Sequence, residues 1–183
     1  MLVRFNGFNL YLALAILVAS MVGCATPANE EKKVLSTLRL HLQARPEPMA
    51  HTEVVEVYRV SPVKFSIDEI PFLTEAMVKE AKVIDAEGGF ALQIQFDQKG
   101  TWLLEEYTSA NRTKHIVVVS QFVEPGEKEL NKGRPLAAPR INNHITNGLF
   151  IFSPDASREE AERVALGLNH VAEKLETGKE IKM

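Results

Sequence analysis

Residues 90–110, FALQIQFDQKGTWLLEEYTSA, carry the clearest structural pattern in this 183-residue chain. Apolar and polar side chains alternate over the first seven residues, which is the period of a β-strand with one buried face. Asp97 then stands where a helix N-cap is expected, and the residues after it form an apolar stripe at helical spacing (Leu103, Leu104 and Tyr107). The stretch therefore predicts a strand that leads directly into a helix over residues 98–110.

Segments upstream of this stretch also have strand patterns. Residues 78–85 form a predicted strand, and Gly88-Gly89 after it predicts a hairpin with the strand of residues 90–96. Residues 34–44 alternate with a strand period, and residues 52–60 are rich in β-branched side chains. The segment 68–76 is ambiguous, because its apolar residues have helical spacing while Pro71 fits only in the first turn of a helix.

The downstream half contains three further predicted features. Residues 115–119 are mostly apolar, as expected of a strand that is covered on both faces. Residues 124–135 are polar, with Pro125-Gly126 and a second Pro and Gly near the end, and predict an exposed loop. Residues 136–152 hold two short strand candidates around Asn147-Gly148, which predicts a hairpin.

The last predicted element is a helix that begins after Ser157. Ser157 and Glu160 fit a capping box, and an apolar face follows at 3.6-residue spacing as far as Leu175. Gly178 is the expected stop. Strands and helices mix without regular alternation, so residues 34–183 predict one α+β domain, with a mixed or antiparallel sheet and two main helices packed on it.

The first 33 residues predict the cellular location of the protein rather than a folded element. Residues 1–23 combine a charged start, an apolar core and small residues, which is typical of a signal peptide, and Cys24 after Gly23 resembles the lipobox of bacterial lipoproteins. The resemblance implies lipidation of Cys24, a flexible tether over residues 24–33 and attachment to a membrane. Two alternatives are a buried structural cysteine and a membrane-spanning helix, although the apolar stretch is shorter than the ~20 residues that a bilayer requires.

Composition excludes several classes of partner and chemistry. The net charge of −3 argues against nucleic acid, because phosphate binding requires a clustered basic face. Cys24 is the sole cysteine, so no intramolecular disulfide can form.

No motif indicates catalysis or a cofactor. None of the five histidines has a partner at metal-ligand spacing, and no Gly-x-Ser-x-Gly element precedes a helix. The carboxylate pairs Glu105-Glu106 and Glu159-Glu160 are explained by an exposed helix face and a first helical turn. We therefore expect a protein that is not an enzyme and that needs no metal or cofactor, with an unrecognised hydrolase as a remaining alternative. Trp102 either packs against the sheet or anchors a partner.

A series of motifs between residues 58 and 171 resembles one known family. In chain order they are Phe96-Asp97-Gln98-Lys99-Gly100, Ile116-Val117-Val118-Val119, Leu136-Ala137-Ala138-Pro139-Arg140-Ile141 with Ile145-Thr146-Asn147-Gly148, and Glu159-Glu160-Ala161 with Val164-Ala165-Leu166-Gly167-Leu168. They resemble the hydrophobic-Asp-x-x-Gly, Ala-Ile-Val-Leu, Ser-Ala-Pro-x-Ile and Glu-Glu-Ala motifs of the head subdomain of the large periplasmic domain of SecD, the export-channel accessory protein. The resemblance implies the head fold, no catalytic residues and contact with translocating polypeptides.

One departure from SecD suggests a binding surface. Residues 121–135 replace a short Asp-Gly turn of the family, so we expect an added loop beside the matched segment. The predicted partner-binding residues lie on this loop and on the segment after it: Glu124, Lys128, Lys132, Arg134, Arg140, Asn142, Asn143 and His144.

These observations together predict a lipid-anchored protein of the bacterial cell envelope that faces the periplasm and binds polypeptides or an envelope or export complex. Ala25 after the cysteine favours the outer membrane over the inner, because Asp at that place is the usual retention signal of the inner membrane. The alternative is a structural lipoprotein that scaffolds an envelope assembly and has no export role.

Overall fold

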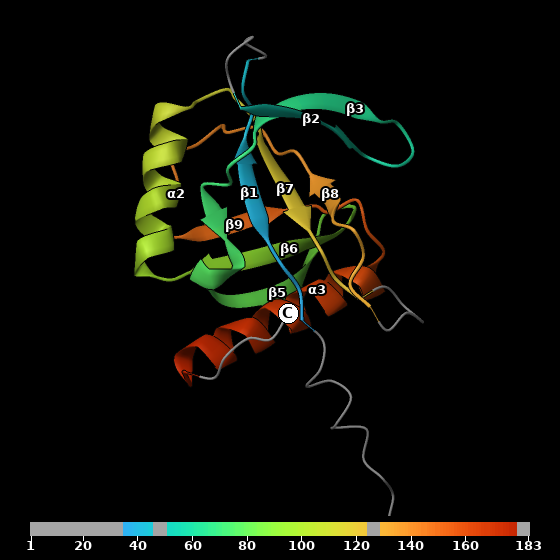
Figure 1. Cartoon of the computed structure of the whole chain (residues 1–183), viewed down its shortest axis with the longest axis vertical. Helices are drawn as coiled ribbons and strands as arrows, with labels where there is room; N and C mark the ends of the chain where they lie inside the picture. The colour runs from blue at the N-terminus through green and yellow to red at the C-terminus, as the bar shows by residue number, and fades with distance from the viewer. Residues whose placement is uncertain (1–34, 46–50, 124–128, 179–183) are drawn as a thin grey trace, which may run out of the picture. The chain divides into compact units, whose positions relative to one another are not determined.

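The computed structural model describes residues 35–45, 51–123 and 129–178, all of which belong to one compact unit, Lys32–Met183. The unit has the predicted α+β class, with antiparallel sheets and two main helices (Figure 1). The predicted signal peptide, Cys24 and the tether lie outside the described residues.

A four-stranded antiparallel sheet forms the centre of the unit. Its strand order is β4-β1-β7-β8, with Leu40 of β1 opposite Leu73 of β4 on one side and Val118 of β7 on the other. The strands are β1 (Arg39–Leu42), β4 (Leu73–Thr74), β7 (Ile116–Ser120) and β8 (Arg134–Ala137).

A two-stranded ribbon, β2 (Thr52–Val57) and β3 (Val63–Asp68), covers one face of this sheet. Val57, Phe65 and Ile67 of the ribbon pack with Val117 of β7 and Ala138 in a small core of their own. The predicted covering of the β7 strand on both faces is therefore confirmed, because Ile116, Val117 and Val118 are all buried.

The third sheet contains the alternating residues 90–96. β5 (Val78–Ala86) and β6 (Gly89–Phe96) form the hairpin predicted from Gly88-Gly89, and β9 (Leu149–Phe152) pairs with the other side of β6. Leu92, Ile94 and Phe96 enter the main core, as their alternation predicts.

Both predicted helices are present with their predicted caps. α2 (Gln98–Ala110) begins after Asp97, whose side chain accepts a hydrogen bond from the Gly100 N–H at 2.7 Å. α3 (Arg158–Glu176) begins with the complete capping box of Ser157 and Glu160. Gly178 follows the last turn with a φ of 65°, a left-handed conformation that glycine adopts without strain.

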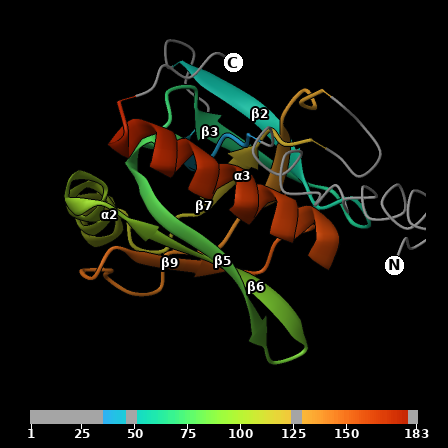
Figure 2. The ribbon, with the colours of Figure 1, turned by 90° about the horizontal axis from the view of Figure 1, so that it is seen from below.

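α3 packs along the outer edge of β5 and closes it. The Asn169 side chain accepts a hydrogen bond from the Ala81 N–H at 2.7 Å and donates one to the Ala81 carbonyl at 2.8 Å. Figure 2 shows the helix running alongside β5, with β9 on the side of the sheet away from it. Asn169 thus occupies the backbone groups that a neighbouring strand would otherwise use.

The structure settles one ambiguous segment and shows that one prediction about local structure is wrong. The helical spacing over residues 68–76 does not give an α-helix: the chain leaves β3, pairs through β4 and makes only the short 3₁₀ helix η3 (Glu75–Met77). Burial of Leu73 beside Leu40 overrides the helical pattern. The hairpin predicted around Asn147-Gly148 is also absent, because β8 pairs with β7 while β9 pairs with β6.

Three smaller expectations also change. The predicted strand over residues 52–60 ends at Val57, and the predicted loop over 124–135 ends before Arg134, which begins β8. The alternation of residues 34–44 places His41 on the polar side of its strand, yet it is buried and its Nδ1 lies 2.8 Å from the Asp68 carbonyl oxygen. The ribbon covers that face, which period-2 alternation within one strand cannot reveal.

Gly167 provides a test of the contact between α3 and the chain before β1. A Cβ at this position would clash with the Ser36 side chain and would lie 2.7 Å from the Ser36 backbone nitrogen. Gly167→Ala should lower the free energy of unfolding by about 1–2 kcal/mol, because overpacking outweighs the gain of about 1 kcal/mol in helix propensity. Chemical denaturation measures this, and adding Ser36→Gly should recover part of the loss. A stabilised single variant would contradict the close contact.

Candidate functional site

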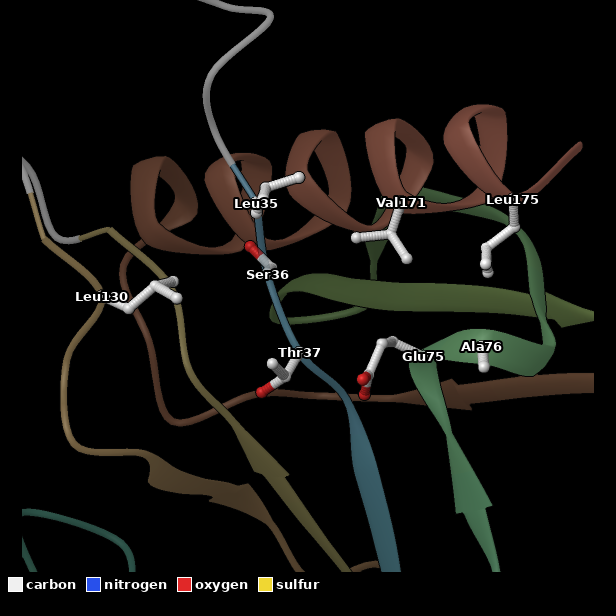
Figure 3. Close-up of a pocket in the computed structure, with 8 residues that line it drawn as sticks. All are labelled: Leu35, Ser36, Thr37, Glu75, Ala76, Leu130, Val171 and Leu175. Carbon is white, nitrogen blue, oxygen red and sulfur yellow. The ribbon is translucent and has the colours of Figure 1, made fainter. Parts of the chain in front are cut away.

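An apolar pocket lies between the chain entering β1, η3 and the C-terminal half of α3. Its volume is about 140 Å³. Figure 3 shows Val171 and Leu175 pointing from α3 toward η3. Its lining residues are Leu35, Ser36, Thr37, Glu75, Ala76, Leu130, Val171 and Leu175.

The polar groups of this pocket are used in structure. Glu75 Oε2 accepts a hydrogen bond from the Leu38 N–H at 3.1 Å, and the Ser36 hydroxyl donates to the Arg163 carbonyl at 3.5 Å. The volume of the pocket is well below the ~300–1,000 Å³ that is typical of small-molecule sites. Its size and lining therefore suit one apolar side chain of a partner.

Sequence analysis did not identify this pocket as a site. Leu175 was predicted as the last apolar residue of the α3 face, but its side chain is 44% exposed. An apolar stripe that runs one turn beyond the core would have been the available signal. Leu35 is out of phase with the apolar positions of the alternating segment 34–44, and Leu130 comes from a predicted loop with no periodic pattern.

A second candidate surface is the tip of the β2–β3 ribbon. Val60 is 97% exposed there, and Tyr58 adopts a φ of 74°, which is a left-handed conformation that a bulky side chain disfavours. The Arg59 N–H donates to Asp155 Oδ2 at 2.7 Å, and the Arg59 guanidinium lies 3.3 Å from Glu160 Oε2. The tip is therefore fixed to the start of α3 while it presents an apolar residue to solvent.

Arg134, one of the predicted binding residues, belongs to the same ionic cluster. Its Nη1 donates to the Asp155 carbonyl at 2.6 Å, and its Nη2 lies 3.4 Å from Glu160 Oε2. A polar cleft of about 200 Å³ adjoins the cluster, between the ribbon tip and β8. Its lining residues are Glu56, Tyr58, Arg59, Pro62, Arg134, Pro135 and Asp155.

The structure separates the predicted binding residues into two groups. Arg134 pairs with Ser120 at one end of β7, whereas Arg140 bridges to His115 at the other end. The five-residue step from His115 to Ser120 along the extended strand spans roughly 17 Å, so the two groups do not form one patch. Lys132 is exposed near Arg134. Glu124 and Lys128 lie outside the described residues.

The second group contains exposed polar side chains: Arg140, Asn142, Asn143 and His144. His144 Nε2 lies 3.5 Å from Glu105 Oε1, and the Arg140 Nε donates to the Thr113 carbonyl at 3.1 Å. The neighbouring His115 has its Nδ1 2.8 Å from Gln43 Oε1. Burial, together with the Arg140 charge, lowers the pKa of His115 below its usual value of 6.5.

Other residues considered from the sequence have simple placements. Trp102 is 62% exposed on α2, which excludes the alternative that it packs against the sheet; the other alternative, that it anchors a partner, stays a hypothesis. Within the three described ranges, no group of three or more histidine, cysteine or carboxylate side chains could hold a metal ion. In the same part of the chain, no helix is both long and apolar enough to cross a membrane.

The geometry defines a small α+β domain whose exposed features are an apolar pocket, an apolar ribbon tip and a polar cleft. Residues 52–172 match the model of the SecDF P1 head subdomain, so the chain belongs to that family. A search of curated proteins found no match.

Solved structures share this fold. The chain aligns with a structure of SecDF, described as a membrane component that enhances protein export, at 19% identity and a TM-score of 0.51, covering 82% of this chain and 71% of that one. It also aligns with a crystal structure of SecDF in its super-membrane-facing form, at 19% identity and a TM-score of 0.52. That alignment covers 79% of this chain and 21% of the other, so the chain corresponds to about a fifth of that protein.

The strained ribbon tip yields one prediction. Tyr58→Gly should be more stable than Tyr58→Ala by about 1 kcal/mol, because only glycine adopts the φ of 74° without cost. Both variants lose the aromatic ring, so the comparison isolates the backbone. Equal midpoints in urea denaturation would show that the tip stores no backbone strain.

His115 yields a prediction about pH. Because its folded-state pKa lies below 6.5, the unfolded chain binds the proton more readily. The contribution of His115 to stability is complete above pH 6.5 and is lost as the pH falls through 6.5 toward the folded-state pKa. His115→Gln should therefore lose less stability than the wild type between about pH 7.5 and about pH 5.5 in denaturant titrations. Parallel pH profiles of the two proteins would count against this.

Proposed function

We propose that this domain is a non-catalytic module of protein export at the bacterial cell envelope, where it contacts polypeptides or an export complex. Membership of the SecDF P1 head family over residues 52–172 is the observation that carries the proposal. SecDF itself is described as a membrane component that enhances protein export.

The apolar pocket supports contact with a polypeptide. It has the size for one apolar side chain, and its rim residues Leu130 and Leu175 are exposed. The exposed Val60 at the ribbon tip would add a second apolar contact. Scattered contacts of this kind fit weak binding of many sequences better than tight binding of one metabolite.

The predicted anchor supports a location at the envelope. Lipid on Cys24, followed by the tether, would hold the domain on a membrane with its face toward the periplasm. One acyl chain binds only marginally, so stable attachment requires more than one chain on the cysteine. The outer membrane remains the favoured site because Ala25 follows Cys24.

Photo-crosslinking in living cells tests the export role. A benzoylphenylalanine at position 175, in place of Leu175 at the pocket rim, is compared with one in place of Glu87 in the exposed β5–β6 turn. We expect export-channel subunits or many secreted chains from the pocket position, and few from the turn. A single stoichiometric envelope partner would favour the scaffold alternative and would contradict the export role.

A filled pocket provides the matched control for this experiment. Ala76→Phe places an aromatic ring at the pocket without changing the buried core, whereas Ala76→Ser leaves the space open. Crosslinks from position 175 should fall in the Ala76→Phe protein and persist in the Ala76→Ser protein. Equal yields would remove the pocket from the proposal.

Lipidation yields a separate prediction. Cys24→Ser removes the thiol that would take the lipid, so an unprocessed precursor without the acyl mass should accumulate. Intact-protein mass spectrometry and membrane fractionation measure both effects. Normal cleavage and membrane retention of the variant would refute the lipoprotein assignment.

A further inference from the structure

The strand edges of the domain differ in how well they are protected. Unpaired backbone groups on an exposed strand edge recruit other chains. Natural proteins therefore keep such edges short, place charged side chains or proline on them, or cover them with another element. The edge of β5 is covered by α3 through Asn169, β4 has two residues, and β8 contains Pro135. β9, at the free edge of the third sheet, has four residues like β8, but its sequence Leu-Phe-Ile-Phe contains neither a charge nor a proline.

The backbone of β9 faces outward at alternate residues. The Phe96 N–H donates to the Gly148 carbonyl at 3.0 Å, and the register continues through Ile94 opposite Phe150. Hydrogen-bonded pairs alternate in an antiparallel ladder, so Phe150 bonds toward β6 while Leu149 and Ile151 direct their backbone groups away from it.

These outward groups are open to a partner. The Leu149 N–H is bonded to Asn147 Oδ1 at 3.0 Å, but within the described ranges no group bonds to the Leu149 carbonyl or to the N–H and carbonyl of Ile151. The Ile151 side chain is 46% exposed. The edge thus combines unpaired backbone groups with an uncharged, β-branched side chain.

We infer that β9 binds an extended segment of polypeptide as an additional strand, which rests on the proposed function and adds to the apolar pocket a second contact that recognises backbone. Backbone donors and acceptors read an extended chain independently of its sequence, which suits many different partners. An edge of four residues spans about 13 Å, too little to bury the ~1,200 Å² of a stable dimer, so a transient segment fits it better than a second copy of this chain.

Fluorescence anisotropy of the full-length chain in detergent tests the edge. The probe is a short fluorescein-labelled peptide that alternates threonine and valine between terminal lysines; its control has proline at every second valine. Ile151→Pro removes the outward donor but leaves the bonds to β6, so it should weaken binding about tenfold. Ile151→Thr keeps the donor and the β-branched shape and should bind within about threefold of wild type.

Three outcomes would overturn the inference. Equal binding by wild type and Ile151→Pro, or no preference for the strand-forming peptide, places polypeptide contact elsewhere. A doubled mass in light scattering that Ile151→Pro abolishes would make a second copy the occupant. If circular dichroism shows that Ile151→Pro is unfolded, Ile151→Lys replaces it as the test variant, because a charge at this position is the device that protects natural edges. Peptide binding equal to that of the wild type would then overturn the inference. Failure of the proposed function is read separately, from the crosslinks in cells.

Discussion

The packing of α3 against β5 and the start of β1 is the constraint on which the rest of the domain depends. Asn169 makes two hydrogen bonds to Ala81, and Gly167 lets the helix approach Ser36 more closely than any side chain would allow. The position of the helix determines what each of its ends contacts. Its first turn holds the ribbon tip through Glu160, and its last turns form a wall of the apolar pocket.

The central sheet is buried on both faces, which explains where the proposed binding features lie. β1 and β7 contribute to the main core on one face, while β7 also meets the ribbon on the other. Such strands have no surface left for a partner. The features proposed to bind a partner therefore lie at the periphery: the pocket beside α3, the ribbon tip and the free edge of β9.

Local pattern in the sequence predicted the elements whose stability is local. The β5–β6 hairpin, α2 with its Asp97 cap and α3 with its capping box depend on neighbours within a few residues, and all three are present. Pairing of distant strands was not predictable in this way. Asn147-Gly148 is a good turn sequence, yet β9 meets β6 rather than β8 because Phe150 and Phe152 are buried beside Leu92 and Ile94.

The candidate site was predicted less well for the same reason. Arg134 was selected for its charge and does lie beside a cleft, but its partners Asp155 and Glu160 come from a distant segment. The residues from Arg140 to His144 lie at the opposite end of the sheet. Leu175 and Ile151 were visible only as members of apolar patterns, because exposure depends on what the rest of the chain fails to cover.

The order of strands in the central sheet has a consequence for how the chain acquires its structure. β1 is the first strand of this sheet in the sequence, but its partners β4 and β7 follow much later. Leu40 therefore cannot pair until Val118 has been synthesised. Pairing over such separations folds slowly and exposes apolar strands in the meantime. The domain therefore completes its core only after α3, the last element in the described part of the chain, has been synthesised and has packed against β5.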